Sequence, residues 1–439
     1  MLKRIVLFVL FLSLISVSDG ESRVYLDINA PTFVQIPIIL PKWRALDRTP
    51  PALSAKVYEI LANDLAISGF FRVIDVDRLP SHLKDKEGIP NTLSLQEWGS
   101  VGGEVLLAGE ISLDSEELHL RLKFHLFDLV EEKHLVGKQY EGHLKNLRMM
   151  VHRMVDEAIL QLTGEKGVNN TKIAYAALHG GGKEIFVADF DGAEVKQITQ
   201  NRSLNLSPVW SPDNKRIAFT SYLKRNPDVY LIDIDGKNLQ RFSYYSGLNA
   251  SPCWSPDGKQ IALMLGMGGK SEIFLIDASG GNPRKLTRGK ENELANEASP
   301  TWSPDGQEIA FVSDRSGSPQ IYIASKDGSV VRRLTYEGSY NTHPAWSPKG
   351  DRIAFCGRVG GHFEIFTIAI DGTGLQKLTS NSGNNESPCW SPDGRYIAFS
   401  SNRTGGSKIY IMNANGLNQR PLTQSKGGET SPSWSKRFE

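Results

Sequence analysis

Cysteine is scarce in this sequence: only Cys253, Cys356 and Cys389 occur among 439 residues. So few cysteines exclude the disulfide-dense scaffold of a small secreted domain. Each lies in an apolar stretch with the pattern of a strand, where a thiol behaves as a small hydrophobic group. We therefore expect buried free thiols and no disulfide bond.

An excess of charge of either sign is also missing. The chain has 50 basic and 49 acidic residues, and both counts are 48 once residues 1–20 are set aside. This balance excludes a polybasic binder of nucleic acid or of an anionic membrane. Hydrophobic residues make up 40% of the chain and charged residues 23%, which is typical of folded proteins and excludes a disordered tail or a coiled coil.

Long hydrophobic runs are absent except near residue 1. Lys3 and Arg4 precede thirteen largely apolar residues, from Ile5 to Val17. This run is shorter than the ~20 residues that span a membrane, and its basic start and small following residues are typical of a secretory signal. We expect an exported protein, cleaved after Gly20 or alternatively after Ser18. An N-terminal membrane anchor is the other interpretation.

Recognisable catalytic and metal-binding motifs are lacking as well. The nine histidines form no His-Glu-x-x-His pair and no cluster with cysteine, and no Gly-x-Ser-x-Gly nucleophile elbow occurs. Residues 266–271 resemble a phosphate-binding loop, but Met264 stands where its first glycine belongs, and a hairpin is favoured. We predict a protein that is not an enzyme and that has no metal and no cofactor.

Two acidic stretches resemble calcium-binding loops. Asp189 is followed two residues later by Asp191, and Asp233 likewise by Asp235. Neither stretch has the full ligand spacing of a calcium loop. Both lie where a hairpin turn recurs along the C-terminal part of the chain, so we assign these residues to turns.

What the sequence has in abundance is one repeat. Six tryptophans recur at spacings of 44, 48, 44, 44 and 44 residues within Ser-Pro-x-Trp-Ser-Pro-Asp-Gly or a close variant of it. A period in the forties with about four strands per unit is typical of propeller blades. The Pro-x-Trp stretch is predicted as a strand and Ser-Pro-Asp-Gly as a type I turn. The repeat residues are Trp210, Trp254, Trp302, Trp346, Trp390 and Trp434.

The two ends of the repeat are incomplete in complementary ways. A strand at Ile173 has Lys166 where its tryptophan belongs, whereas Trp434 lacks the apolar strand that should follow it. We infer that the strand around Trp434 completes the sheet begun at Ile173. Residues 171–439 are then an all-β six-bladed propeller with no free edge.

Residues 21–163 follow another pattern, that of a smaller mixed α/β domain, and residues 164–170 are the predicted linker. Apolar residues at helical spacing predict helices over 52–68 and 144–162, and a short helix is predicted over 94–98. Strands are predicted at 23–28, 33–40, 71–74, 104–109, 118–127 and 138–142.

An export signal, a small α/β domain and a propeller of this repeat, in this order, resemble the TolB family of the Tol–Pal system over essentially the whole chain. The repeat is shared with peptidase-associated and sugar-lyase propellers, but the segment from Ala62 to Ile74 is similar to the family's N-terminal domain. Asn214 and Lys349 depart from the repeat at the glycine and aspartate of two turns.

The resemblance implies a non-catalytic adaptor in the periplasm. Such a protein would bind the lipoprotein Pal through its propeller and the inner-membrane protein TolA through its mature N-terminus. It would support outer-membrane integrity and constriction at cell division.

The closed ring places one predicted partner surface at the mouth of its channel. The residue pairs that precede the six Pro-x-Trp strands gather there, and their small and amide side chains suit protein binding. We predict this face as the docking site of Pal, and the alternative is a set of solvated loops. The pairs are Asn205 and Leu206, Asn249 and Ala250, Glu297 and Ala298, Asn341 and Thr342, Asn385 and Glu386, and Glu429 and Thr430.

A second partner surface is predicted at the mature N-terminus. Glu21, Ser22, Arg23, Val24 and Tyr25 begin a stretch with the pattern of a strand. Such a strand can pair with a partner's sheet or with its own domain, but not with both at once. We expect this segment to bind TolA and its docking to be switchable. A purely structural edge strand is the alternative.

Two rival functions make different demands on the sequence. A peptidase accessory or hydrolase would need a nucleophile elbow with Asp and His partners. A metal-dependent sugar lyase would need histidines that converge from several blades, and the propeller contains only His179, His343 and His362.

Overall fold

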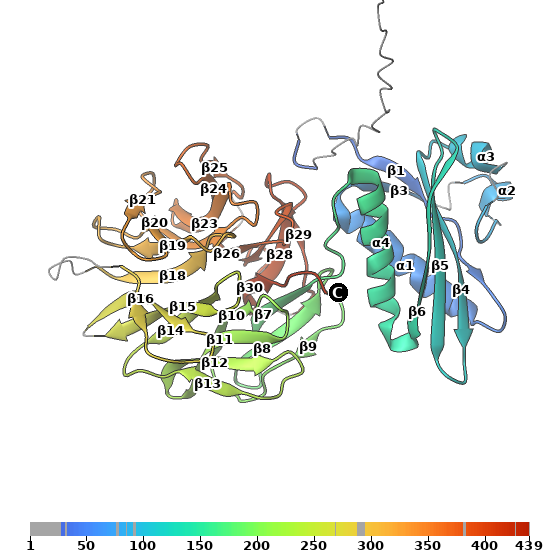
Figure 1. Ribbon diagram of the computed structural model, residues 1–439. Coiled ribbons are helices and arrows are strands. Elements are labelled where there is room, and N and C mark those ends of the chain that lie inside the picture. The colour runs from blue at the N-terminus through green and yellow to red at the C-terminus, as the bar shows by residue number, and fades with distance from the viewer. Residues whose placement is uncertain are drawn as a thin grey trace, which may run out of the picture.

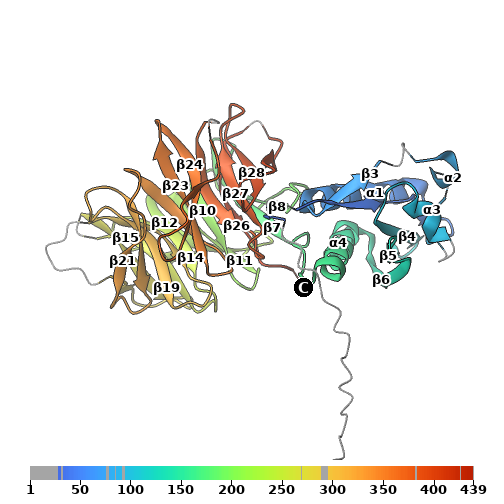
Figure 2. The same cartoon turned by 90° about the horizontal axis from the view of Figure 1, so that it is seen from above.

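The computed structural model describes residues 28–30, 33–75, 79–84, 86–90, 94–267, 269–287, 295–380, 383–425 and 427–438. The predicted signal, its cleavage site and the segment Glu21–Tyr25 lie outside the described residues. The described chain forms two bodies side by side, a smaller N-terminal domain and a ring of sheets (Figures 1 and 2).

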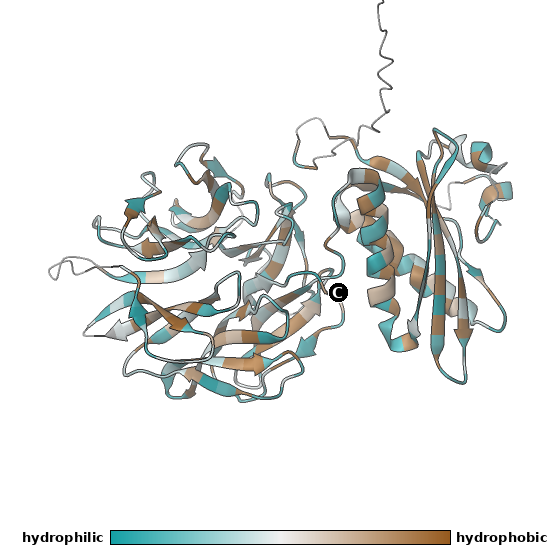
Figure 3. Ribbon diagram, in the orientation of Figure 1, coloured by the Kyte–Doolittle hydropathy of each residue, from teal (hydrophilic) through white to brown (hydrophobic). Residues whose placement is uncertain are grey.

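The N-terminal domain is built on one mixed sheet with strand order β3-β1-β4-β5-β6, and β2 pairs with β4. Helices α1 and α4 pack on one face of this sheet, whereas α2 and α3 pack on the other. Both long helices show alternating hydrophobic and hydrophilic stretches (Figure 3), as expected of helices with one buried face. The elements are β1 (Ile36–Ile39), β2 (Arg44–Ala45), α1 (Pro51–Ser68), β3 (Phe71–Ile74), α2 (Ser81–Lys84), α3 (Leu95–Gly99), β4 (Val105–Asp114), β5 (His119–Asp128), β6 (Lys133–His143), a 3-10 turn (Leu144–Asn146) and α4 (Leu147–Thr163).

The long helices and the alternating strand of this domain agree with the sequence. The helix predicted over 52–68 is α1, and Gly69 ends it with the positive φ (71°) that glycine adopts readily. The prediction for β6 was too short, because this strand pairs with β5 along its whole length from Lys133 onward. Among the described residues, no helix is both long and apolar enough to cross a bilayer.

The propeller consists of six four-stranded sheets, which confirms the fold predicted from the repeat. Each strand that ends at a repeat tryptophan lines the central channel, and the other strands follow outward. From inner to outer strand, the sheets are β10 (Asn205–Trp210), β11 (Arg216–Lys224), β12 (Asn226–Asp233) and β13 (Gln240–Ser243); β14 (Asn249–Trp254), β15 (Gln260–Met267), β16 (Lys270–Asp277) and β17 (Arg284–Lys285); β18 (Glu297–Trp302), β19 (Glu308–Ser313), β20 (Gln320–Ser325) and β21 (Val331–Arg333); β22 (Asn341–Trp346), β23 (Arg352–Val359), β24 (His362–Ala369) and β25 (Gln376–Lys377); β26 (Asn385–Trp390), β27 (Tyr396–Ser401), β28 (Lys408–Asn413) and β29 (Arg420–Pro421); and β30 (Thr430–Trp434), β7 (Lys172–His179), β8 (Gly182–Asp189) and β9 (Lys196–Gln197).

The last of these sheets joins the two ends of the propeller. β30 pairs antiparallel with β7, and Trp434 lies opposite Ile173. The indole N–H of Trp434 donates to Thr171 Oγ1 at 2.7 Å. The predicted closure of the ring by its C-terminal strand is therefore confirmed.

Each repeat tryptophan packs against the blade that precedes its own. The six indoles are 5–8% exposed, and Trp210, for example, packs on Ile185 of the preceding sheet. The indole N–H of Trp210 also donates back to the carbonyl of Ser433 at 3.1 Å. Burial of one indole contributes roughly 4–6 kcal/mol before entropic costs, so neighbouring blades stabilise one another.

The two departures from the repeat have distinct local consequences. Asn214 replaces glycine at a positive φ of 59°, and its Nδ2 donates to the carbonyls of Lys436 and Arg437, both at 3.0 Å. This turn therefore anchors the segment that follows β30. Where Lys349 replaces the turn aspartate, Asp351 accepts the hydrogen bond from Ser347 Oγ instead, at 2.9 Å.

Two further predictions concern the blades. Gly266 and Met267 of β15 pair antiparallel with Ser271 and Lys270 of β16, which agrees with the predicted hairpin. All three cysteines are free, as predicted. Cys356 is fully buried, whereas Cys253 and Cys389 lie half-buried in the channel wall.

Candidate functional site

The inner strands enclose a channel, and the end at which these strands begin is called here the mouth. A cavity of about 180 Å³ inside the channel is lined by one Pro from each blade together with the residue before it. These preceding residues have φ between 49° and 56° and lie at bulges, which redirect side chains. They are Ser207, Ser251, Ser299, His343, Ser387 and Ser431. His343 is exposed to the channel, and desolvation by the wall lowers its pKa.

The residues predicted from the sequence as the partner surface do lie at the mouth, but seven of the twelve are buried. The first members of the six pairs are each at most 3% exposed. They are Asn205, Asn249, Glu297, Asn341, Asn385 and Glu429. Their side chains do not form the exposed surface that we expected, and a role for these positions in binding Pal stays a prediction.

Burial follows from the hydrogen bonds that these side chains make to the preceding blade. Asn205 Nδ2 donates to Glu184 Oε2 at 3.0 Å, and Thr199 Oγ1 donates to the same oxygen at 2.5 Å. Asn385 Nδ2 of β26 likewise donates to Glu364 Oε2 of β24, in the preceding blade, at 2.9 Å. A buried carboxylate is costly without such donors, so these residues fix how one blade meets the next.

Glutamate takes the place of asparagine as the first member of two of the six pairs. Its side chain then accepts hydrogen bonds, whereas the asparagine Nδ2 donates them. Glu297 accepts hydrogen bonds from Thr287 Oγ1 at 2.7 Å and from the backbone N–H of Ile273 at 3.1 Å. Arg315 Nη2 completes the set at 2.5 Å as an ion pair. Glu429 likewise accepts from the hydroxyl of Thr423. Both glutamates thus serve the contact between blades.

Loops and hairpins form the exposed surface around the mouth instead. Among the second members of the pairs, Ala250 is buried, and the other five are half-buried: Leu206, Ala298, Thr342, Glu386 and Thr430. Seven large apolar side chains at this end are 38–72% exposed, and we name them the mouth surface: Leu178, Leu204, Tyr222, Tyr244, Tyr336, Tyr340 and Val359. Tyrosine is enriched at protein interfaces, so four tyrosines on one face favour protein binding.

Sequence reasoning missed the mouth surface because it followed the repeat, and these residues lie where the repeats differ. The available signal was the position of the tyrosines: Tyr244 and Tyr340 stand five residues and one residue before the inner strands that begin at Asn249 and Asn341. An aromatic residue shortly before a predicted inner strand could therefore have been predicted as part of the partner surface.

The N-terminal domain contacts the opposite end of the blades. Each inner strand runs from the mouth to its tryptophan, so the turns after the tryptophans lie at that far end. There Arg395 pairs with Glu165 of the linker at 3.2 Å, and Arg420 Nη2 donates to the carbonyl of Ile67 in α1 at 3.0 Å. Tyr396 donates its hydroxyl to the carbonyl of Ser68. The described part of the N-terminal domain therefore contacts the end of the blades opposite the mouth.

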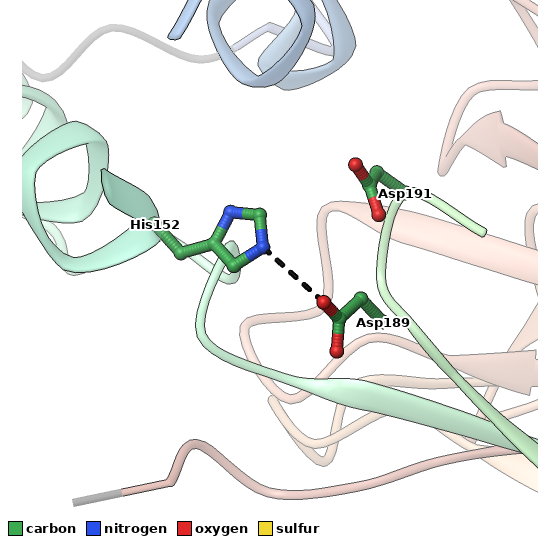
Figure 4. Close-up of side chains that lie close together, drawn as sticks. All are labelled: His152, Asp189 and Asp191. Atoms are coloured by element: carbon green, nitrogen blue, oxygen red, sulfur yellow. Dashed lines mark ion pairs between the residues drawn. The ribbon is translucent and has the colours of Figure 1, made fainter. Parts of the chain in front are cut away.

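A group of charged side chains lies at the centre of the domain contact. His152 of α4 bonds Asp64 of α1 through Nδ1 at 2.6 Å, and its Nε2 faces Asp189 of β8 at 3.5 Å (Figure 4). Arg148 bonds Asp189 through Nε at 3.2 Å and pairs with Asp191 through Nη2, and Lys172 pairs with Asp189. We name these six residues the interdomain cluster.

The protonation states in the interdomain cluster follow from burial and from the partners. Burial opposes the charge on His152, but hydrogen bonds and Coulomb attraction from Asp189 and Asp64 outweigh it and raise its pKa to about 9. Burial raises the pKa of Asp64 to about 6 against the pull of His152. Burial also opposes ionisation of Asp189, yet His152 and Lys172 hold its pKa well below the ordinary value.

The same side chains supply the one group of three possible metal ligands that occurs among the described residues, namely His152, Asp189 and Asp191. A metal ion there would compete with Arg148 and Lys172, which already bond these carboxylates. With His152 protonated, three positive charges balance three negative ones. The arrangement therefore favours an ion-pair network between the domains over a metal centre.

The sequence indicated part of this cluster. Asp191 does serve its turn, since Oδ1 accepts from the N–H of Ala193 at 3.1 Å, but the turn interpretation missed the ion pairs. The available signal was His152, a titratable residue within the apolar stripe of a predicted amphipathic helix. Its partner Asp189 depends on how the two domains meet.

Comparisons with known proteins agree with this architecture. Residues 160–438 match the family model of the TolB beta propeller domain, and residues 24–135 match that of the TolB amino-terminal domain. The chain is similar to the Tol-Pal system protein TolB of Syntrophotalea carbinolica, with 35% identity over 209 residues that cover 46% of this chain and 47% of that protein. The corresponding protein of Desulfosudis oleivorans is 37% identical over 192 residues, which cover 43% of each chain.

The matched segments thus span less than half the length of these curated relatives. A solved structure, TolB from Acinetobacter baumannii, is similar over 92% of this chain and 97% of its own, with a TM-score of 0.80 and 26% identity. Because the propeller model alone matches more than half of the 439 residues, the chain belongs to the TolB family.

Proposed function

We propose that this chain is a non-catalytic periplasmic adaptor of the Tol–Pal system and that it binds the lipoprotein Pal through the mouth surface. Its family is that of Tol–Pal system proteins. The observation that carries the proposal is geometric: the described part of the N-terminal domain contacts the far end of the blades, and the opposite end, the mouth, carries four exposed tyrosines.

Two of these tyrosines are held in place before any partner arrives. The Arg241 guanidinium lies 4.8 Å from the ring centroid of Tyr244, and that of Arg333 lies 4.7 Å from the ring centroid of Tyr336. Such cation–π contacts restrict the rings. An aromatic side chain that is already positioned loses little entropy on binding, which is the property of a strong anchor at an interface.

The test is the affinity of the full chain for the soluble domain of Pal, measured by titration calorimetry. We expect Tyr244→Ala with Tyr336→Ala to raise the Kd about tenfold or more, as loss of anchor residues does. Leu239→Ala with Leu417→Ala is the matched control, because these exposed side chains lie at the far end of the blades. An unchanged Kd in the tyrosine variant would refute binding at the mouth.

Charge reversal at the originally predicted acidic residues is a weaker test. Glu297→Lys would break a buried ion pair with Arg315 and would destabilise the blade whatever the partner does. Glu386 is half-buried without that pair, so Glu386→Lys is the interpretable variant of the two.

We infer further that Glu21–Tyr25 binds TolA, on the basis of its strand pattern and of the family. A full chain that lacks these five residues should lose TolA in a pull-down and retain Pal. Loss of both partners, or of neither, would refute the division between two surfaces. We propose that the resulting assembly supports outer-membrane integrity and constriction during cell division.

A further inference from the structure

One side of the mouth carries three exposed cations close together. Arg202 lies in the loop before β10, and Lys224 and Arg225 lie in the hairpin between β11 and β12. The N–H of Tyr222 donates to the carbonyl of Leu204 at 3.0 Å, which holds loop and hairpin together. Within the described part of the chain, no ion pair neutralises any of the three cations. We name these five residues the basic patch.

Arg225 occupies a backbone conformation that glycine adopts in the corresponding hairpin of the other five blades. Its φ is 71°, in the left-handed region that disfavours any side chain. The corresponding hairpins of the other five blades contain a glycine with positive φ: Gly181, Gly269, Gly317, Gly361 and Gly405. The hairpin can therefore form without arginine, and backbone strain that persists in this way points to a use for the side chain.

Among the described residues of the mouth, most of the exposed charged side chains are positive. In the described loops and strand ends of the mouth, the exposed charged residues include Arg202, Lys224, Arg225, Arg358 and Glu337. Several acidic residues of the same region are buried and accept hydrogen bonds from their neighbours, as Glu184, Glu364 and Glu429 do. Among the described residues, a partner that touches this surface meets more guanidinium and ammonium groups than carboxylates.

We propose that the basic patch binds a cluster of acidic side chains on the protein that docks at the mouth. This inference rests on the proposed function, in which that protein is Pal, and it names the chemistry of the contact. Guanidinium groups bind carboxylates in a bidentate manner. Tyr222 and Leu204, exposed between the cations, take apolar side chains next to those carboxylates. This mixture of exposed apolar and basic groups fits a protein surface better than a lipid headgroup.

The test uses Arg225→Gly in the full chain, because this variant removes the charge and relieves the backbone at once. We expect its melting temperature to equal or exceed that of the wild type. We expect its Kd for the soluble domain of Pal to rise about tenfold, since a hydrogen bond to a charged group is lost, and to depend less on salt between 50 and 300 mM. Arg202→Gln should act in the same direction.

Two controls lie at the far end of the blades. Asn238→Gly makes the same backbone exchange at φ 53°, and Lys237→Gln removes an exposed charge; both should bind Pal as the wild type does. An unchanged Kd in both arginine variants would overturn the inference while Pal binding, and so the proposed function, stands. Failure of the wild type to bind Pal overturns both. Loss of binding to phosphatidylglycerol vesicles with intact Pal binding would assign the patch to lipid and overturn the inference.

Discussion

Replacement of His152 by glutamine tests whether a buried imidazolium joins the two domains. His152 is 3% exposed and contacts Asp64 in its own domain and Asp189 in the propeller. Glutamine keeps a polar side chain but carries no charge. Asp64 and Asp189 then lose a counter-ion at a site that water does not reach, and breaking a buried pair in this way is strongly destabilising.

The magnitude follows from the change in pKa. The pKa of His152 rises from its ordinary 6.5 to about 9 in the folded protein. At 1.36 kcal/mol per unit, this shift corresponds to about 3 kcal/mol of stability. Because the folded-state value is the higher one, this contribution is complete below about pH 6.5 and is lost as the pH rises through about 9.

The assay is urea denaturation of the full chain at pH 6.5, 7.5 and 9.5. His152→Gln should cost about 3 kcal/mol at pH 6.5 and little at pH 9.5, where the wild type has lost the same contribution. His119→Gln is the control, because this histidine is half-exposed on the sheet of the same domain. A difference between His152→Gln and the wild type that is equal at pH 6.5 and pH 9.5 would refute the reasoning.

Three further outcomes test the construction of the ring. Asn205→Leu should lower the free energy of unfolding by about 1–3 kcal/mol in urea titrations, because buried Glu184 loses a donor; an unchanged value would contradict the role assigned to Asn205. Removal of residues 430–438 should leave the edge of β7 unpaired and give oligomers in size-exclusion chromatography, whereas a stable monomer would show that the ring does not need β30. Asn214→Gly should speed hydrogen exchange at Lys436 N, which donates to Asn214 Oδ1 at 3.0 Å, and equal exchange in variant and wild type would exclude this anchor.

The propeller could be predicted from the sequence because its information is local and repeated. Each Trp marks the end of an inner strand, each Ser-Pro-Asp-Gly or its variant forms a turn, and six copies average out single departures such as Lys349. Even the pairing of Trp434 with Ile173 followed from arithmetic on the repeat. A pattern with a fixed period constrains the fold more strongly than any single residue does.

The location of the candidate site could be predicted from the sequence, but the exposure of its side chains could not. The sequence indicated the end of the ring at which Asn205 and its counterparts lie, but their burial depends on acceptors such as Glu184 that the neighbouring blade brings close. The exposed tyrosines lie outside the repeat and leave no periodic trace. The ion pair between His152 and Asp189 depends on how two separately patterned domains meet, which no local pattern encodes.

The pairing of β30 with β7 also has a consequence for folding during synthesis. The inner strand of the sheet that starts at Lys172 is made about 260 residues after its neighbour, so the nascent chain holds five complete sheets and one unfinished sheet until its last segment emerges. Such a distant contact is slow to form, and until then β7 offers a bare edge to other chains. A chaperone that shields this edge until the final strand arrives would therefore act on the step most exposed to misassembly.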